Sequence, residues 1–139
     1  MQSQILFEDA KLVAPGILAM EQFGHTVAIE GDFAVVGAVF DDFRGPASGS
    51  AFVFDASTGV LVDRLAGNDT AADDIFSDGL AISDGLIYAG APRNESNGRF
   101  AGRAYVFGGP NLSQIDRFDA ERIIFVGEDP VGAAIGWSI

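Results

Sequence analysis

The apolar residues of this chain form short runs that are separated by glycine, aspartate or serine. Residues 27–29 and 33–36 are two such runs, and Gly31 and Asp32 lie between them. Short runs that contain β-branched residues predict strands, and a pair of this kind favours the tight turn of an antiparallel hairpin. Two further runs follow at residues 51–54 and 60–65. The pattern therefore predicts about four short strands in this part of the chain.

The same pattern occurs a second time. Residues 23–39 align without a gap with residues 76–92, a shift of 53 positions. The same shift carries residues 49–54 onto residues 102–107, and a third copy begins at residues 135–139. Repetition at a fixed period predicts structural units of the same fold.

A four-stranded unit that repeats about every 50 residues is typical of a propeller blade, in which twisted antiparallel sheets pack face to face. No segment shows helical periodicity, and eighteen glycines interrupt the chain. Gly37 and Gly90 occupy equivalent positions and would let neighbouring sheets approach closely. A β-sandwich is the alternative, but it does not require the same residues at a fixed spacing. We expect an all-β fold of four-stranded antiparallel propeller blades, with two complete repeats and partial flanking strands.

The residues that carry the repeat resemble a known family. Phe23-Gly24 opens the first unit, residues 35–38 read Val-Val-Gly-Ala, and residues 49–54 follow. This pattern is similar to the FG-GAP repeat, the blade motif of integrin α-subunit propellers and of many bacterial and algal surface or secreted proteins. Ser77 departs from it, because it stands where the second copy should have the glycine of the motif.

The resemblance implies more blades than this chain contains, since the integrin propeller has seven. Repeat units bury their faces only against neighbours. We therefore expect either a fragment of a larger protein or a chain that completes its sheets by self-association. The expected units are the last strand of a preceding blade with its connection at 1–22, a first blade at 23–75, a second blade at 76–134 and the truncated start of a third at 135–139.

Composition narrows the function classes. Eight Lys and Arg against twenty Asp and Glu give a net charge of −12. Nucleic-acid binding is excluded, because it requires basic side chains that neutralise phosphates. No apolar run approaches the roughly 20 residues that span a bilayer, so we expect no membrane insertion. The start of the chain lacks the pattern of a signal peptide, and the chain has no cysteine for disulfides or thiol chemistry.

The sequence offers little for catalysis. His25 is the only histidine, so a Ser-His-Asp arrangement could form only around it, and its place at the start of a strand favours a structural or exposed residue. Asp55 begins a turn through Thr58 and Gly59 that is similar to a turn of quinoprotein-like propellers. We interpret Asp55 as a turn residue rather than a cofactor contact. We therefore expect a non-enzymatic protein without catalytic or cofactor-binding residues.

Calcium is the one cofactor that the resemblance suggests. Integrin-type blades often carry an Asp-x-Asp-x-Asp-Gly calcium loop between the first two strands, but here only residues 30–32 make that connection. Three residues cannot supply the six to eight oxygens that calcium requires. Acidic clusters remain in two other connections. The weak candidate ligands are Asp41, Asp42, Asp69, Asp73 and Asp74.

The longest connections carry the candidate contact residues. Residues 41–48 and 93–101 join the second and third strands of each unit, and long loops are the usual place for ligand contacts. The candidates are two aromatic residues beside aspartates and three arginines: Phe40, Phe43, Arg44, Arg93 and Arg99. Such residues suit a protein or a polysaccharide ligand, in particular one that carries carboxylates. The other phenylalanines are interpreted as core residues.

Three asparagines lie in Asn-x-Ser/Thr sequences, and they are Asn68, Asn94 and Asn111. The motif fits glycosylation in a secreted protein, and it equally fits turns, in which these residue types are common. Taken together, the sequence predicts a non-catalytic extracellular or cell-surface repeat scaffold for adhesion or ligand binding. The alternatives are an accessory propeller region of a larger extracellular hydrolase or phospholipase, and a quinone-binding propeller.

Overall fold

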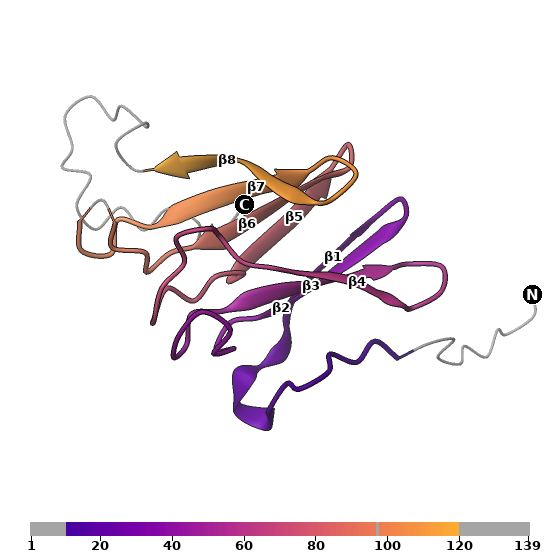
Figure 1. The fold of residues 1–139 in the computed structure, drawn as a ribbon, viewed down its shortest axis with the longest axis horizontal. Helices are drawn as coiled ribbons and strands as arrows, with labels where there is room; N and C mark the ends of the chain where they lie inside the picture. The colour runs from indigo at the N-terminus through magenta and orange to yellow at the C-terminus, as the bar shows by residue number, and fades with distance from the viewer. Residues whose placement is uncertain (1–10, 97, 120–139) are drawn as a thin grey trace, which may run out of the picture.

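The computed structural model describes residues 11–96 and 98–119, which form two four-stranded antiparallel sheets (Figure 1). The first sheet contains β1 (Phe23–Glu30), β2 (Phe33–Ala38), β3 (Ser50–Asp55) and β4 (Leu61–Leu65). The second contains β5 (Gly79–Ser83), β6 (Leu86–Ala91), β7 (Arg103–Gly108) and β8 (Ser113–Asp119). A single turn of 3-10 helix, η1 (Ala19–Glu21), precedes β1. The predicted all-β fold with two four-stranded units is confirmed.

No helix among the described residues has the length and apolar character needed to cross a membrane.

The hairpins form where the sequence predicts them. β1 and β2 are joined through Gly31 and Asp32, and β5 and β6 through Asp84 and Gly85. The backbone of Gly31, Asp84 and Gly85 has φ values of +58°, +51° and +77°. These residue types tolerate that region of conformational space, so they allow two-residue turns between the strands.

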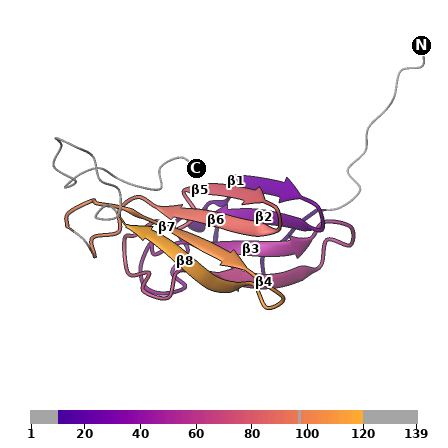
Figure 2. The same ribbon diagram turned by 90° about the horizontal axis from the view of Figure 1, so that it is seen from above.

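The two sheets stack face to face, with β1 beside β5 (Figure 2). Apolar side chains from both sheets fill the space between them and form the interface core. Its buried residues are Val35, Ala51, Val53 and Leu65 on one side and Phe76, Ile87, Ala89, Ala91, Tyr105, Phe107 and Leu112 on the other. The ring of Phe76 has no exposed surface, and its centroid lies 5.5 Å from that of Tyr105 and 6.0 Å from that of Phe107. Burial of these side chains joins the repeats into one structure.

The opposite face of the first sheet carries a second cluster, whose buried residues are Ala14, Ala34, Val36, Ala38, Phe52 and Phe54. Leu12 and Ile17 from the preceding segment pack against it, although residues 11–18 form no strand. The other part of the expected flanking strand falls on residues 1–10, which lie outside the described residues. The expected third copy at 135–139 also lies outside them.

Gly37 and Gly49 lie directly against Phe76 and Ser77, in the chain before β5. A Cβ atom on Gly37 would lie 2.9 Å from the carbonyl oxygen of Ser77, so the predicted close approach at this glycine is confirmed. Gly49 forms a parallel bridge with Phe76. Ser77 adopts a φ of +76°, and its hydroxyl donates a hydrogen bond of 2.7 Å to the carbonyl of Ser50. This bond explains how a serine occupies the glycine position of the motif.

Candidate functional site

Three connections meet at one end of the stacked sheets, on the left in Figure 1. They are the β2–β3 loop at 39–49, the β4–β5 connection at 66–78 and the β6–β7 loop at 92–102. We call them together the loop surface. The β4–β5 connection bonds to the β2–β3 loop, because the amides of Asp73 and Phe76 donate to the carbonyls of Pro46 and Ser48 at 2.8 Å each. The β2–β3 loop is thereby held against the β4–β5 connection.

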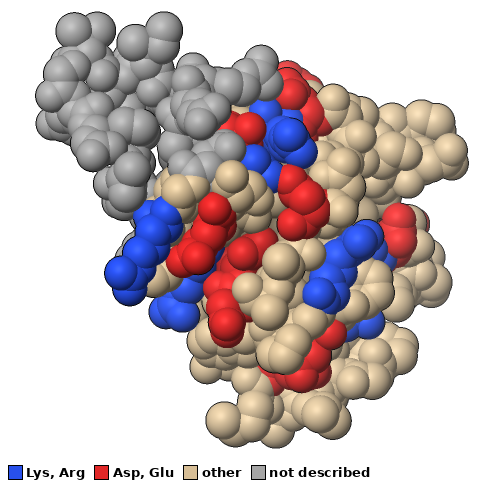
Figure 3. All heavy atoms as spheres, turned by 60° about the vertical axis from the view of Figure 1, so that its left-hand side comes forward, with Lys and Arg blue, Asp and Glu red and all other residues tan. Residues whose placement is uncertain are grey.

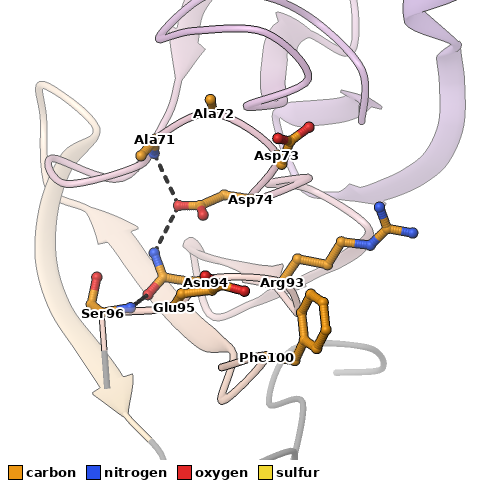
Figure 4. A pocket seen from close by; sticks show the side chains of 9 residues that line it. All are labelled: Ala71, Ala72, Asp73, Asp74, Arg93, Asn94, Glu95, Ser96 and Phe100. Carbon is orange, nitrogen blue, oxygen red and sulfur yellow. Dashed lines mark hydrogen bonds between the residues drawn. The ribbon is translucent and has the colours of Figure 1, made fainter. Parts of the chain in front are cut away.

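A hollow of about 590 Å³ separates the β4–β5 connection from the β6–β7 loop (Figure 4). Residues 71–74 line one side, and residues 93–96 with Phe100 line the other. The buried side chain of Asp74 joins the two sides. Its carboxylate accepts hydrogen bonds from the amide of Ala71 at 2.9 Å and from the side chain of Asn94 at 2.7 Å. The hollow is therefore part of a fixed structure rather than a gap between independent loops.

Asn94 is equally buried, and its side-chain oxygen accepts a hydrogen bond of 3.1 Å from the amide of Ser96. Both ends of its amide group are thus used within the fold. The Asn-x-Ser sequence at Asn94 could mark a glycosylation site or a turn, and in the structure Asn94 forms a turn. Asn68 and Asn111 are exposed.

Burial raises the pKa of the Asp74 carboxyl, because loss of water disfavours the charged form more than the hydrogen bonds from Ala71 and Asn94 favour it. The folded state then binds the proton of Asp74 more tightly than the unfolded state does. Its contribution to stability is present below the unfolded pKa of 3.8 and is lost as the pH rises through the folded pKa.

Replacing Asp74 by asparagine removes this titration and keeps an oxygen that can accept both hydrogen bonds. We expect the free energy of unfolding of Asp74→Asn, relative to the unchanged chain, to increase as the pH rises from 4 to 7. Urea unfolding of both proteins, followed by circular dichroism at several pH values, measures this difference. If the difference in unfolding free energy between the two proteins stays constant or decreases as the pH rises, burial does not raise the pKa of Asp74.

The candidate metal ligands in the β2–β3 loop accept hydrogen bonds or form ion pairs within the protein. The Asp41 carboxylate is buried, forms an ion pair with Arg64 and accepts a hydrogen bond from the hydroxyl of Ser50. The exposed Asp42 accepts a hydrogen bond of 2.8 Å from the amide of Ala47. The two neighbouring aspartates thus point in different directions and do not share a site.

The candidates of the β4–β5 connection are also separated. The Asp69 carboxylate accepts hydrogen bonds from the Tyr105 hydroxyl at 2.8 Å and from Arg117 at 3.0 Å, and it forms an ion pair with Arg103. Burial of the Tyr105 hydroxyl is the main cause that raises its pKa, and the hydrogen bond that it donates to Asp69 is the second. Asp73 is exposed with a φ of +65°. Among residues 11–96 and 98–119, no three acidic or histidine side chains are grouped as metal ligands, and calcium stays a prediction.

Aromatic side chains on the loop surface are exposed, and two of them are the contact candidates Phe40 and Phe43. Phe40 is 36% and Phe43 44% exposed. The guanidinium of Arg64, from β4, lies 4.1 Å from the centroid of the Phe43 ring. This cation–π contact holds the ring at the surface in a defined position.

The sequence predicts core positions for Phe100 and Phe118 with the other phenylalanines, and this is wrong for both, because Phe118 is 40% exposed and Phe100 lies at the loop surface. Phe100 is 43% exposed, and the guanidinium of Arg99 lies 5.2 Å from the centroid of its ring. The available signal was the Arg-Phe pair itself, because Phe43 and Arg44 form the same pair in reverse order in the other long loop. The repeat alignment hid it, since the two pairs are not in register.

The three candidate arginines differ from Arg103 in their ionic contacts. Within the described part of the chain, Arg44, Arg93 and Arg99 form no ion pair, whereas Arg103 is buried between Asp69 and Asp119. Figure 3, in which the left side of Figure 1 is turned forward, shows acidic side chains between groups of basic ones. The loop surface therefore offers cations in spite of the large negative charge of the chain.

Other residues weighed from the sequence have structural roles. His25 contacts Asp78 at 3.0 Å, which links β1 to the start of β5. The carboxylate of Asp55 accepts hydrogen bonds from the amides of Ser57 and Thr58 at 2.8 and 2.9 Å. Hydrogen bonds from the Ser57 hydroxyl and from these amides lower the pKa of Asp55. The prediction that Asp55 caps a turn is confirmed.

Comparison with known families gives one match. A model described as the FG-GAP repeat matches residues 6–54 and 60–107, more than half of the chain. The second match contains β4 of the first sheet and β5, β6 and β7 of the second. The sequence repeat is thus offset by one strand from the sheets. No curated protein was found to match the chain.

Proposed function

We propose that this chain, which belongs to the FG-GAP repeat family and is a repeat scaffold of propeller type, binds a ligand without catalysis, outside the cell or at its surface. Its task would be adhesion or ligand display. The observation that carries the proposal is the loop surface, where exposed aromatic rings lie beside arginines on connections fixed by a rigid pair of sheets.

The composition of the loop surface is that of a binding site. Aromatic residues and arginine are the residue types that dominate the energy of protein interfaces. Phe43 and Phe100 combine both features, since each exposed ring has a guanidinium near it. Exposed rings held in place lose little conformational freedom when a partner covers them, which favours binding.

The backbone of the loop surface supports the same proposal. Several residues other than glycine adopt positive φ there, and they are Ala47, Asp73, Ile75, Ser77 and Phe100. Such conformations cost free energy and persist only where the surrounding structure holds them, typically in loops that serve binding. Here the hydrogen bonds between the three connections hold these backbone conformations in place.

The ligand chemistry follows from the charges. Arginine binds carboxylates through paired hydrogen bonds, and Arg44, Arg93 and Arg99 have no carboxylate partner among the described residues. A polysaccharide with uronic acid units or an acidic protein segment would supply carboxylates, and apolar sugar or side-chain surfaces would cover the rings.

Polygalacturonate is the first probe, with neutral dextran and an Asp-rich peptide beside it. We expect the chain to bind polygalacturonate and not dextran, with an affinity that falls as salt increases. Arg93→Ala should weaken binding by about 3- to 10-fold, as for loss of one charged hydrogen-bonding group. Lys11→Ala removes the same charge from an exposed residue outside the loop surface and should change nothing.

Biolayer interferometry on the immobilised chain measures these affinities. Binding to the peptide alone would assign the site to a protein partner. Absence of binding to both anionic probes, or equal effects of Arg93→Ala and Lys11→Ala, would contradict a carboxylate-binding loop surface.

A further inference from the structure

The outermost strand of each sheet carries the same pair of residues. β4 and β8 are the last strands of their sheets, and within the described ranges no strand pairs with their outer edges. Figure 2 shows both strands on the same side of the stack. Asp63-Arg64 in β4 and Asp116-Arg117 in β8 are 53 positions apart, so they occupy equivalent positions of the repeat.

In both strands the aspartate side chain bonds to the backbone of the next residue. The Oδ1 atom of Asp63 accepts a hydrogen bond of 2.8 Å from the amide of Arg64. The Oδ1 atom of Asp116 accepts one of 2.8 Å from the amide of Arg117. An amide that donates to its own strand's side chain is not donated to the inner neighbour, β3 or β7. Both amides therefore belong to the outer edge, where the two aspartates are exposed.

A β-bulge lies next to each of these aspartates. In β4 the pairing with β3 skips Val62, and in β8 the pairing with β7 skips Ile115. The skipped side chains are 50% and 55% exposed. A bulge increases the local twist and interrupts the pairing pattern of the strand. The two outer edges thus share the same irregularity and the same capped amide.

Both edges have the features of a site where another chain adds a strand. An outer strand offers amides and carbonyls that no neighbour uses, so a strand of a second molecule can pair with it. Exposed apolar side chains at the edge favour such pairing, and Val60 before β4 and Phe118 in β8 are 62% and 40% exposed. Asp63 also lines two hollows of about 380 and 360 Å³, so its edge can be reached from outside.

The capping aspartate opposes strand addition in two ways. It uses the amide hydrogen to which the carbonyl of an added strand would have to bind. Its carboxylate also lies where that carbonyl oxygen would come, so an added strand would remove water from a charged group without replacing the lost hydrogen bonds. The cost falls on edge pairing alone, because the exposed carboxylate is hydrated in the separate molecule.

We propose that Asp63 and Asp116 keep folded copies of this chain from joining through their outer edges. The same bond at both equivalent positions carries the proposal, since each sheet has its own open edge. It uses no residue of the loop surface and does not depend on the proposed ligand.

Amide hydrogen exchange, measured by nuclear magnetic resonance, tests the capping bond. After correction for the intrinsic rate of each sequence, Asp63→Ala should speed exchange of the Arg64 amide about tenfold, the effect of losing one hydrogen bond to a charged group. Asp116→Ala should do the same at Arg117. Unchanged exchange at both amides would overturn the proposal, because the aspartates would then cap nothing.

Sedimentation velocity tests the consequence for association. In about 0.3 M salt, which screens the repulsion between copies of charge −12, the Asp63→Ala/Asp116→Ala chain should associate at least about tenfold more tightly than the unchanged chain. Either single variant opens one edge and should form pairs, because two identical edges meet. The double variant opens two edges and should form longer assemblies.

The asparagine variants are the matched control. Asp63→Asn/Asp116→Asn removes the same charge as the alanine double variant but keeps an oxygen that can accept the amide hydrogen. It should associate like the unchanged chain. Asp32→Ala removes a charge from an exposed residue of the β1–β2 turn and should also have no effect.

A low concentration of urea separates edge pairing from aggregation of unfolded chains. Pairing between folded copies should weaken as urea is added, whereas aggregation through unfolding should increase. Three results of these association experiments would overturn the proposal: an alanine double variant that associates no more than the unchanged chain, asparagine variants that associate as strongly as the alanine ones, and association that grows with urea.

Discussion

Replacing Gly49 by alanine is expected to destabilise the chain by about 2–5 kcal/mol, a large part of the stability of a small protein. Gly49 has a φ of +81°, where a side chain costs roughly 1–2 kcal/mol. A Cβ atom there would also lie within 3.0 Å of three backbone atoms of Phe76, which cannot move without separating the sheets. Overpacking of this kind adds about 1–3 kcal/mol. Urea unfolding followed by far-ultraviolet circular dichroism measures the change.

Gly85→Ala is the control for this substitution. Gly85 has nearly the same φ, +77°, but a Cβ atom there would meet no atom within 4 Å. Gly85→Ala should therefore lower the free energy of unfolding only by the cost of the backbone conformation, about 1–2 kcal/mol. Equal destabilisation by the two substitutions would mean that the backbones of the two repeats do not approach each other at Gly49.

Truncating Phe76 to alanine should cost about 3–5 kcal/mol, the range for a fully buried phenylalanine. Its ring packs on Tyr105 and Phe107 in the interface core, so the cavity would open between the sheets rather than at an edge. The loss would appear as a lower urea midpoint for the whole chain, because the interface core joins both repeats.

Phe23 is the internal comparison for Phe76, since it occupies the same position one repeat earlier. Its ring lies 5.7 Å from Phe52 and 6.2 Å from Phe54, but the side chain is only partly buried. Less apolar surface returns to water on truncation, so Phe23→Ala should cost clearly less than Phe76→Ala. A larger destabilisation by Phe23→Ala would contradict this account, because it would mean that the main core lies on the face of the first sheet that points away from the second sheet.

The strands and hairpins could be predicted because their signals are local. Each strand is a short apolar run with β-branched or aromatic residues, and each short hairpin has residues that tolerate positive φ, such as Gly31 and Gly85. The shift of 53 positions then gave the number of sheets without any knowledge of contacts. Asp55 was assigned correctly for the same reason, because its partners are only two and three positions away.

The candidate site depends on contacts that a single sequence does not encode locally. The Asp41 carboxylate was a candidate calcium ligand, yet Arg64 reaches it from 23 positions along the chain. Asp69 is likewise paired with Arg103, 34 positions away. Carboxylates can be counted in a sequence, but the cations that neutralise them depend on how the connections fold over the sheet ends.

The loop surface was predicted in part. The two long loops were identified from their length, and Phe43 from its place beside Asp42 in one of them. The role of the β4–β5 connection between them was missed, because its amides bond to Pro46 and Ser48 only after the sheets have stacked. Phe100 was missed because the Arg-Phe pair falls out of register with the repeat.

Backbone and side-chain contacts between strands, measured by nuclear Overhauser spectroscopy, test most directly whether each repeat folds as its own sheet and stacks on the other. We predict cross-strand contacts between Val36 and Phe52 and between the equivalent pair Ala89 and Tyr105, with a contact from Gly49 to Phe76 joining the sheets. Cross-strand pairs that combine a strand of residues 23–65 with a strand of residues 79–119 in one sheet would contradict the stacked repeats, and with them the loop surface.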